Sequence, residues 1–331
     1  MGFPRGKITE RDGMRESEII NVALVGTGVI GRSWMRVFSR AGCCTRLYDN
    51  DRSQTQKALA WFEESLNLDV SEGFITAKEA ESSRALVSAH DDLTDALSGV
   101  QYIQESGPEK LEIKQMIFRL LDQTADPEVI IASSTSSLDM NQIAEGLHGI
   151  SRCIMAHPFN PPHIIPVVEV MPTRKTNPEV TKATIDFLKR MGQKPVLVNF
   201  YVSGYLINRI QAAVVREAIH QVERGLADVD AVDTVIRDGL GLRWALFGNF
   251  GVNNTNADGG IREYYSRFGE AYKTVMNDLD STPPTFAPDM IERIGRGVDA
   301  MEGKTPLSAI CRWRDRMVLR IRALKEKDPN P

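Results

Sequence analysis

Between residues 21 and 67, the spacing of apolar residues changes back and forth between the pattern of a strand and the pattern of a helix. Asn21–Val25 is a β-rich run that ends in glycines, and Val29–Ala41 follows it with apolar residues at helical spacing. Arg46–Tyr48 and Ser53–Asn67 then repeat the order of a short strand and a long helix. This pattern predicts strand, turn, helix, strand and helix, which are the elements of an α/β fold.

The alternation of short apolar runs with helical stretches continues to about residue 203. A helical segment near Glu109–Asp122 lies among further strand-like runs. Such alternation predicts a doubly wound, Rossmann-type sheet of parallel strands with crossover helices. The further strand-like runs are Tyr102–Glu105, Val129–Ala132, Cys153–Ala156 and Val167–Val170.

Strand signals disappear beyond residue 204. Tyr205–Arg224 has apolar residues at helical spacing, and Val229–Arg237 and Pro288–Ala300 are further helix-like stretches. A charged helical tail is predicted over Leu307–Lys327. The second part of the chain is therefore predicted to be all helical.

These changes in pattern divide the chain into three predicted parts. Residues 1–20 are mostly polar and without periodicity, which is typical of a mobile extension. Residues 21–203 form the predicted α/β domain, and residues 204–331 form the predicted helical domain. A chain of 331 residues is long enough for two domains that each bury a core.

Composition and charge exclude several classes of partner. With 42% hydrophobic and 25% charged residues, the chain is an ordinary globular sequence. A net charge of -4 leaves no basic face to follow a phosphate backbone, so we predict no nucleic-acid partner. No apolar run reaches the roughly 20 residues that cross a bilayer, so no membrane partner is predicted either.

The four cysteines bear on compartment and metal binding. Cys43, Cys44, Cys153 and Cys311 show no metal-ligand spacing, and no apolar secretory segment precedes them. Such usage is typical of reduced thiols in a cytoplasmic protein. The sequence therefore predicts a cytoplasmic protein without a metal site.

Candidate chemistry begins at a glycine-rich turn after the first predicted strand. In Gly26-Thr27-Gly28-Val29-Ile30-Gly31 the first glycine allows a tight turn, the second lets the backbone approach a pyrophosphate, and the third permits close helix packing. The helix that begins at Val29 and Ile30 offers N-terminal amides and a positive dipole end. We expect Gly26, Gly28, Val29, Ile30 and Gly31 to bind a dinucleotide.

The acidic residue Asp49 selects between the two nicotinamide dinucleotides. It lies eighteen residues beyond Gly31, at the end of the next predicted strand, where a carboxylate receives the ribose hydroxyls. A carboxylate there repels a 2′-phosphate, although Arg52 leaves one cation nearby. The sequence therefore predicts NAD as the cofactor, in preference to NADP.

A histidine and a glutamate predict the reaction. His157 comes directly after the predicted strand Cys153–Ala156, where open α/β sheets place ligands. Loss of hydride from a secondary alcohol needs a base for the hydroxyl proton, and a neutral imidazole titrates near the working pH. Glu169, on the strand after the loop, is placed to bond the other ring nitrogen. The pair therefore predicts an alcohol-oxidising site.

Together these motifs resemble the 3-hydroxyacyl-CoA dehydrogenase superfamily, over nearly everything after residue 20. The family pairs a catalytic histidine with a glutamate twelve residues later, as His157 and Glu169 are spaced. The resemblance selects Ser136 from the run Ser133–Ser137, and it selects Asn208 in the first helix of the second domain. It implies that Ser136 and Asn208 hydrogen-bond the substrate oxygen.

The same resemblance implies two further contacts, and the loop after His157 offers a third candidate. Glu109 and Lys114 are expected near the cofactor, although a solvated helix face explains both residues equally well. Asn160, in the loop after His157, is expected to bind the substrate.

Two segments are similar to the branch that contains lambda-crystallin and L-gulonate 3-dehydrogenase, residues 28–34 and residues 239–245. In the second, Arg243 stands where acyl-CoA enzymes carry no cation. A guanidinium binds a free carboxylate in a bidentate pair, although an ion pair at a helix end or dimer interface is the alternative. The resemblance implies NAD-dependent oxidation of the 3-hydroxyl of a small free acid, L-gulonate to 3-dehydro-L-gulonate.

Other functions stay open from the sequence. L-Carnitine dehydrogenase shares a Leu-Arg-Trp segment and a free 3-hydroxy acid substrate, and Trp244, Phe247, Tyr264 and Tyr265 could surround a quaternary ammonium. A 3-hydroxyacyl-CoA dehydrogenase acting on 3-hydroxybutyryl-CoA shares the catalytic set. A crystallin-like structural protein would bind the dinucleotide without needing that set. Helical second domains of dehydrogenases commonly dimerise, so a homodimer is expected.

Overall fold

The structure is a computed structural model that describes residues 20–328. The chain forms two compact units that divide between Asn208 and Arg209. This division lies five residues after the predicted change at 203, because Tyr205 is buried in the core of the first unit and the amides of Leu206 and Ile207 bind there. The predicted mobile extension, apart from residue 20, lies outside the described residues.

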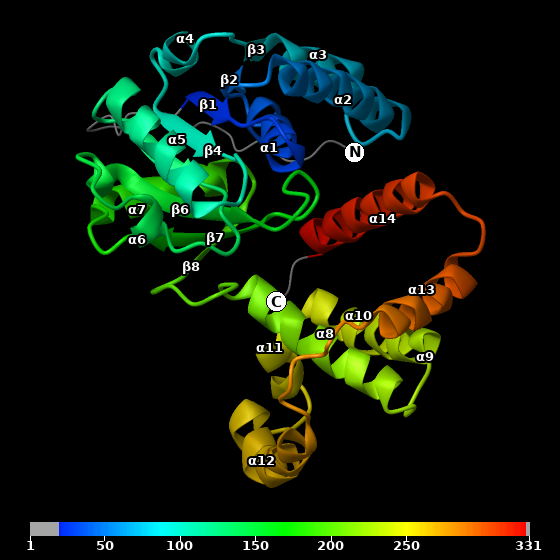
Figure 1. The fold of residues 1–331 in the computed structure, drawn as a ribbon. Coiled ribbons are helices and arrows are strands. Elements are labelled where there is room, and N and C mark those ends of the chain that lie inside the picture. The colour runs from blue at the N-terminus through cyan, green and yellow to red at the C-terminus, as the bar shows by residue number, and fades with distance from the viewer. Residues whose placement is uncertain (1–19, 329–331) are drawn as a thin grey trace. The chain divides into compact units, whose positions relative to one another are not determined.

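An eight-stranded sheet forms the centre of the first unit (Figure 1). Its strand order is β3-β2-β1-β4-β5-β6-β7-β8, and every neighbouring pair is parallel except β6 with β7. The order reverses between β1 and β4, as in doubly wound, Rossmann-type sheets, so the predicted fold class is confirmed. The strands are β1 (Asn21–Val25), β2 (Cys44–Tyr48), β3 (Val87–Ala89), β4 (Tyr102–Glu105), β5 (Ile130–Ser133), β6 (Cys153–Pro158), β7 (Val167–Pro172) and β8 (Lys194–Leu197).

The antiparallel pair corrects the prediction of an all-parallel sheet. Residues 159–166 join β6 to β7, and this loop is shorter than the dozen or more residues that a parallel crossover needs. The chain therefore turns back, and the register places His157 directly opposite Glu169. The edge strands β3 and β8 were not predicted, because they are short and mostly exposed and so lack an apolar pattern.

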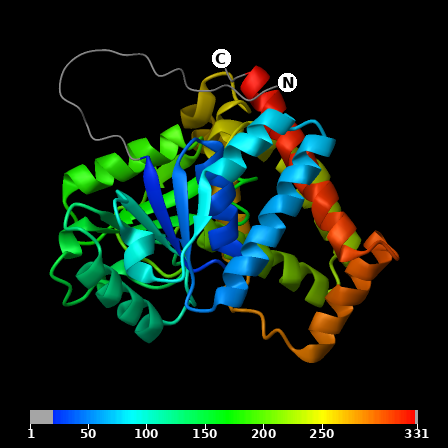
Figure 2. The same ribbon diagram turned by 90° about the horizontal axis from the view of Figure 1, so that it is seen from above.

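Helices cover both faces of this sheet (Figure 2). Val22 and Leu24 of β1 pack in one core with side chains from α1, α2 and α7, whereas Ala23 and Val25 pack in a second core with α4, α5 and α6. Alternate residues of a strand point to opposite faces, so one strand serves both cores. The helices are α1 (Val29–Arg40), α2 (Arg52–Ser71), α3 (Ala77–Ala85), α4 (Leu93–Leu97), α5 (Leu111–Thr124), α6 (Met140–Ile143) and α7 (Pro178–Arg190).

Aromatic packing fixes α1 against the sheet. Trp34 and Phe38 lie four residues apart on one helix face, are fully buried, and stack with their ring centroids 5.1 Å apart. Phe38 also packs against Phe187 of α7 at 5.5 Å. The start of α1, which follows the glycine turn, is therefore held firmly above the carboxyl end of β1.

In its described residues, 209–328, the second unit has helices and connecting loops but no strand, as the pattern predicted. Its buried apolar cluster consists of Ile219, Val222, Val232 and Met290. No helix within residues 20–328 has the length and hydropathy that a membrane crossing requires. The helices are α8 (Ile207–Glu223), α9 (Val229–Thr234), α10 (Gly241–Leu246), α11 (Asn249–Asn254), α12 (Gly260–Asp278), α13 (Pro288–Glu302) and α14 (Leu307–Lys327), with a π-helical turn over Val235–Leu240.

Candidate active site

The glycine turn joins the carboxyl end of β1 to α1. Gly26 has a φ of +92°, and a Cβ there would lie 2.8 Å from the carbonyl group of Ser106. A Cβ on Gly31 would lie 2.0 Å from the carbonyl oxygen of Gly26, so only glycine lets α1 come this close. A Cβ on Gly28 would meet no atom of residues 20–328 within 4 Å. The turn is closed on the protein side and open where a pyrophosphate could lie.

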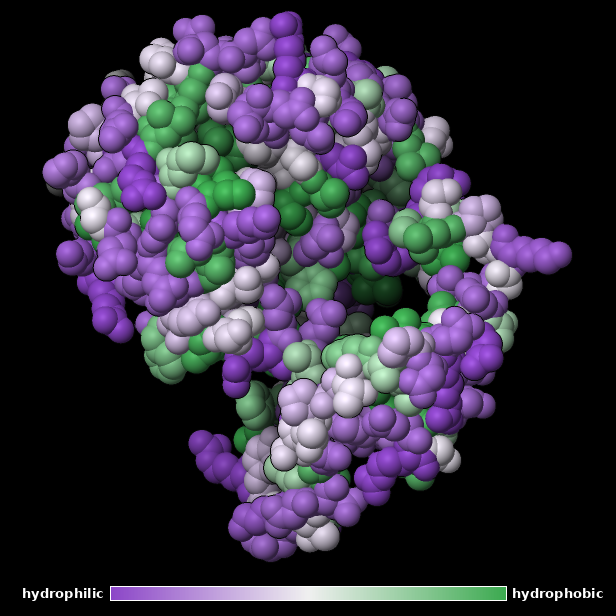
Figure 3. All heavy atoms as spheres, in the orientation of Figure 1, coloured by the Kyte–Doolittle hydropathy of each residue, from purple (hydrophilic) through white to green (hydrophobic). Residues whose placement is uncertain are grey.

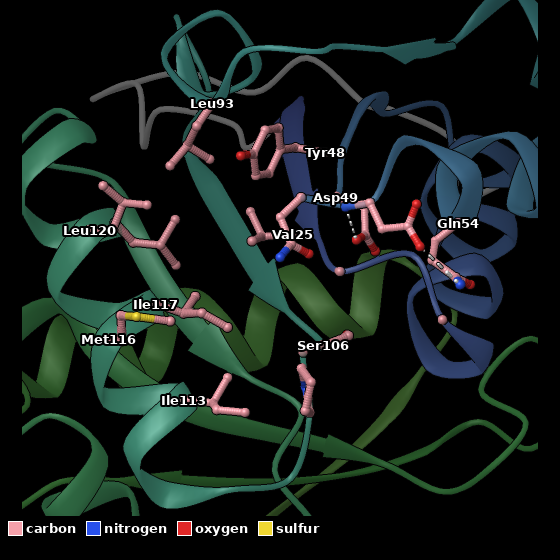
Figure 4. A pocket seen from close by; sticks show the side chains of 17 residues that line it. Val25, Tyr48, Asp49, Gln54, Leu93, Ser106, Ile113, Met116, Ile117 and Leu120 are labelled. Atoms are coloured by element: carbon pink, nitrogen blue, oxygen red, sulfur yellow. Dashed lines mark hydrogen bonds between the residues drawn. The ribbon is translucent and has the colours of Figure 1, made fainter.

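A cavity of about 680 Å³ opens beside this turn (Figure 4). Ile113, Met116 and Leu120 of α5 form an apolar wall, and Asp49 lies toward the other end. An apolar wall suits a purine ring, and a carboxylate suits ribose hydroxyls. The cavity therefore fits the adenosine half of a dinucleotide.

Only some of the residues predicted to bind the dinucleotide line this cavity. Three of them line it directly, namely Gly26, Gly28 and Asp49. The other residues of the turn belong to the first turn of α1, where Val29 is exposed and Ile30 packs against the first core.

Asp49 also organises the turn that it faces. Its Oδ2 atom accepts hydrogen bonds from the backbone amide of Thr27 at 2.8 Å and from the Thr27 hydroxyl at 3.0 Å. Its Oδ1 atom accepts from the amide of Asp51 at 3.0 Å. The carboxylate therefore ties β2 to the glycine turn, a role that the sequence pattern did not reveal.

Lys114 forms a buried ion pair with Glu105 near the serine run, and the partly exposed Glu109 lies beside it. Lys114 is almost fully buried, and its Nζ donates to both carboxylate oxygens of Glu105 at 2.9 and 3.0 Å and to the carbonyl oxygen of Gly107 at 3.2 Å. Its distance to Glu109 Oε2 is 3.6 Å. Lys114 is thus not on a solvated helix face, and neither it nor Glu109 is among the residues that line the cavity.

Glu109 accepts several hydrogen bonds from the serine run. Its Oε1 atom accepts from the hydroxyl of Thr135 at 2.7 Å, from the amide of Ser136 at 2.8 Å and from the amide of Ser137 at 2.9 Å. Burial alone would raise the pKa of Glu109, but these hydrogen bonds and the charge of Lys114 lower it overall. Glu109 is therefore an ionised anchor for the segment that contains Ser136.

His157 and Glu169 are neighbours across the antiparallel pair β6 and β7. His157 Nδ1 lies 2.7 Å from Glu169 Oε2, and both side chains are buried. The sequence analysis placed His157 just after a strand, whereas it lies inside β6, which extends to Pro158. This difference arises because strand pairing continues to Val168 opposite Pro158.

The second oxygen of Glu169 binds the start of α8. Oε1 accepts hydrogen bonds from the backbone amides of Leu206 at 2.7 Å and Ile207 at 2.9 Å. Burial opposes ionisation of Glu169, but the bonds from His157 and the two amides outweigh it and lower the pKa. An ionised Glu169 therefore holds the histidine and the first turn of α8 together.

Asn208, in the first turn of α8, contacts the serine run. Its Nδ2 atom donates to the carbonyl oxygen of Ser136 at 3.2 Å. The Ser136 hydroxyl lies 3.2 Å from Glu109 Oε1. Ser136, His157, Glu169 and Asn208, which are far apart in the sequence, are thus connected within the first unit.

Two predicted substrate residues are not joined to this group. Asn160 is exposed in the loop between β6 and β7. Arg243 lies in α10 of the second unit, where its side chain is also exposed. Their predicted contacts with substrate stay predictions.

Sequence reasoning missed the buried support beneath the serine run. Glu105 binds Lys114 and accepts from the hydroxyl of Ser133 at 2.7 Å, while Gln104 donates to Ser134 Oγ at 2.7 Å. One signal was present, because Glu105 ends β4 as polar residues at ligand-binding edges do. No group of three metal-binding side chains occurs within the described part of the chain.

The fold and the first unit's cavity define a dinucleotide-dependent enzyme, and the sequence comparisons identify the family. Residues 21–200 match the NAD-binding domain of 3-hydroxyacyl-CoA dehydrogenase, and residues 204–292 match the C-terminal domain of that enzyme. The protein is therefore an NAD-dependent oxidoreductase. The chain belongs to the 3-hydroxyacyl-CoA dehydrogenase family.

Relatives cover almost the whole chain. A lambda-crystallin homologue from Bos taurus is 35% identical over 93% of this chain and 96% of its own length. L-Carnitine dehydrogenase from Oceanobacillus iheyensis is 29% identical over 92% of this chain and 98% of its own. Among solved structures, a 5-formyl-3-hydroxy-2-methylpyridine 4-carboxylic acid 5-dehydrogenase, an NAD-dependent dismutase, aligns with a TM-score of 0.77 and 26% identity, covering 93% of this chain and 99% of that one.

Proposed function

We propose that this protein oxidises the 3-hydroxyl of a small free hydroxy acid, and that its substrate is L-gulonate, which becomes 3-dehydro-L-gulonate. The main support for the proposal is the His157–Glu169 pair. Both side chains are buried, and His157 Nδ1 lies 2.7 Å from Glu169 Oε2 in a unit that matches an NAD-binding domain. A histidine held in this way is suited to act as the base in alcohol oxidation.

Glu169 sets the tautomer of His157. An ionised carboxylate beside Nδ1 favours a proton on that nitrogen, so Nε2 is left with a lone pair. Nε2 then accepts the proton of the substrate hydroxyl, and Glu169 stabilises the imidazolium that forms. NAD, when bound, supplies the hydride acceptor.

Ser136 and Asn208 are proposed to hold the reacting oxygen. Asn208 Nδ2 carries two protons and uses one toward the carbonyl oxygen of Ser136, so the other is available to a substrate. The Ser136 hydroxyl donates to Glu109, which leaves its oxygen free to accept from an alcohol.

Two of the relatives have names that point to a substrate with a free carboxylate, whereas a third is named a 3-hydroxyacyl-CoA dehydrogenase. Carnitine is itself a free 3-hydroxy acid, and the solved dismutase acts on a pyridine carboxylic acid. We propose that the Arg243 guanidinium binds this carboxylate, because a bidentate pair recognises a carboxylate and a thioester offers none. Within this class we propose L-gulonate, because residues 28–34 and 239–245 are similar to the branch that contains L-gulonate 3-dehydrogenase, and the similarity to a lambda-crystallin homologue supports that branch.

A substrate panel tests the proposal. NAD reduction is measured with L-gulonate, L-carnitine, 3-hydroxybutyrate and 3-hydroxybutyryl-CoA, on the wild type and on Arg243→Ala. The free acid should be preferred, and Arg243→Ala should lower its kcat/KM about thirty- to a thousandfold, the scale of a lost charge-assisted pair. A wild type that prefers the thioester, with free-acid kinetics unchanged in the variant, would replace this proposal with the acyl-CoA activity. No turnover with any of the four would favour a structural role.

L-Carnitine is the second candidate, because an aromatic cluster forms on α12. The rings of Tyr264 and Phe268 lie 5.0 Å apart, and Tyr264 and Tyr272 share a hydroxyl hydrogen bond of 3.0 Å. That bond raises the pKa of Tyr272. Aromatic faces attract a quaternary ammonium. Preferred turnover of L-carnitine in the panel would select this candidate.

We also propose a cytoplasmic homodimer. The sequence basis for this compartment is that the four cysteines have no metal-ligand spacing and follow no apolar secretory segment. The second unit exposes large apolar side chains on several helices, although its buried cluster is small. A second copy of the chain would cover such surfaces. Side chains exposed by more than 60% are Ile210, Leu226, Val235, Leu242, Leu246, Phe250, Met276, Leu307 and Leu324.

A further inference from the structure

Two arginines project from α1 toward α2, but only one has an acidic partner. Arg36 donates to Ser65 Oγ at 2.6 Å and pairs with Asp69. One helical turn earlier, the guanidinium of Arg32 lies over the ring of Trp61, 4.8 Å from its centroid. Within residues 20–328 Arg32 forms no ion pair, and its buried Nε atom has no hydrogen-bond partner.

This arrangement leaves an uncompensated cation partly inside the protein. Burial lowers the pKa of Arg32, yet an arginine keeps its charge at any physiological pH. Removing a charge from water without a counter-charge is unfavourable, and the ring of Trp61 offsets only part of that cost. An anion that arrives from solution would complete the site.

The cluster formed by Arg32, Trp61 and His163 lies at the ligand-binding edge of the sheet. Arg32 is in the first turn of α1, directly after the carboxyl end of β1. His163 packs edge-on against Trp61 at 5.4 Å, and it belongs to the loop that joins the strands of His157 and Glu169. The loop that joins β6 to β7 therefore contacts Trp61, the same ring over which the Arg32 guanidinium lies.

A second contact ties α1 to the reacting groups. Trp34, two residues after Arg32, donates from Nε1 to Ser134 Oγ at 3.3 Å. Ser134 precedes Ser136 by two residues in the run that Glu109 holds. The start of α1 therefore contacts both the serine run and, through Trp61, the loop after His157.

We propose that Arg32 binds the carboxylate of the hydroxy acid and is a specificity-determining residue of the first unit. This inference rests on the proposed function, because only a free acid carries that carboxylate. Trp61 holds the guanidinium by one face, which leaves its edge to form a bidentate pair.

Direct binding tests the proposal without turnover. The Kd of L-gulonate, and of 3-hydroxybutyrate as a second acid, is measured by calorimetry on the enzyme–NADH complex of Arg32→Met, Arg32→Lys and Arg190→Met. Arg190 is the matched control, because its guanidinium also lies over a ring, that of Phe187 at 5.9 Å, on an exposed helix end. Arg32→Met should weaken acid binding about ten- to a hundredfold, the scale of hydrogen bonds to a charged group. Arg32→Lys should weaken it less, and Arg190→Met should leave it unchanged.

The other outcomes overturn the inference in distinguishable ways. Weaker NADH binding in Arg32→Met with unchanged acid binding would assign Arg32 to the cofactor pyrophosphate. Unchanged binding of both ligands would leave it a packing residue on Trp61. If an acid binds the wild type and all variants equally, only the Arg32 inference falls. If neither acid binds the wild type, the proposed function falls with it. Thermal unfolding of each variant shows whether the first unit still folds.

Discussion

Three carboxylates connect single residues of the first unit to the backbone around them. Asp49 binds the amide of Thr27, Glu109 binds the amides of the serine run, and Glu169 binds the start of α8. For Glu109 and Glu169 these hydrogen bonds lower the pKa and so stabilise the ionised carboxylate. Each acid therefore positions a segment besides any contact it makes with a ligand.

The first prediction at this scale concerns the catalytic pair. His157→Gln should lower kcat about two to four orders of magnitude, the usual contribution of a general base, while the NADH Kd measured by fluorescence stays unchanged. Glu169→Gln should also be severe, because the tautomer of His157 is no longer set. The double variant should be much less impaired than the product of the single effects. Near-normal turnover of His157→Gln would exclude its role as the base.

A second residue-scale prediction separates two roles of Asp49. Asp49→Ala removes both the charge and the acceptor for Thr27, so it should weaken NAD binding and narrow the preference over NADP. Asp49→Asn keeps an oxygen acceptor for Thr27, so it should bind NAD better than Asp49→Ala. Because it removes the charge, it should still reduce the preference for NAD over NADP. Steady-state KM values for both cofactors measure these effects. Equal use of NAD and NADP by the wild type would contradict the assignment.

At the scale of elements, the serine run and the start of α8 depend on ionised acids. Glu109 holds one segment and Glu169 the other, and both have a pKa below the ordinary carboxyl value of 4.5. In the unfolded chain these groups take up protons at higher pH than in the folded chain. Their contribution to stability is therefore present above pH 4.5 and is lost as the pH falls through the lower, folded-state pKa.

Acid unfolding measures this dependence. The free energy of unfolding, from urea titrations between pH 7 and pH 3, should fall steeply below pH 4.5. Glu109→Gln should be less stable at neutral pH but should show a shallower fall, because the variant has one fewer group to protonate. Glu145→Gln, an exposed acid of the same unit, is the control. Parallel curves for the wild type and Glu109→Gln would show that Glu109 does not carry this stability.

At the scale of the whole molecule, the two units bury their apolar side chains unequally. The first unit has two large cores on either side of its sheet, whereas the described part of the second has one small cluster. Purple and green residues alternate over the surface in Figure 3, and the apolar ones are not confined to one unit. Large exposed apolar surfaces favour association with another chain.

The homodimer gives the prediction at this scale. Sedimentation at micromolar concentration should give about twice the mass of the 331-residue chain. The double variant Ile210→Glu and Phe250→Glu, at two exposed positions of the second unit, should shift it toward the monomer, because charges oppose burial. Leu68→Glu, an exposed position of the first unit, should leave the mass unchanged. A wild type that sediments as a monomer would contradict the proposal.

Local patterns were sufficient for the elements that carry strong periodicity. The glycine turn, the strand Asn21–Val25 and the helix Leu307–Lys327 lie where the sequence predicted them. The strand β7 was predicted at Val167–Val170, but its antiparallel direction was missed, because strand direction depends on loop length and pairing, which a period of two residues does not encode. The short edge strand β8 was missed because its side chains are mostly exposed.

By itself, the sequence determined the class of fold, the cofactor and the residue types available for catalysis, because these depend on local spacing and on side-chain chemistry. Only the tertiary structure decided which groups meet. The antiparallel turn between β6 and β7 sets His157 against Glu169, and residues 206 and 207 reach Glu169 from a distant part of the chain. The position of the Arg32 guanidinium over Trp61 is likewise visible only in three dimensions, because Trp61 comes from α2 and not from the helix of Arg32.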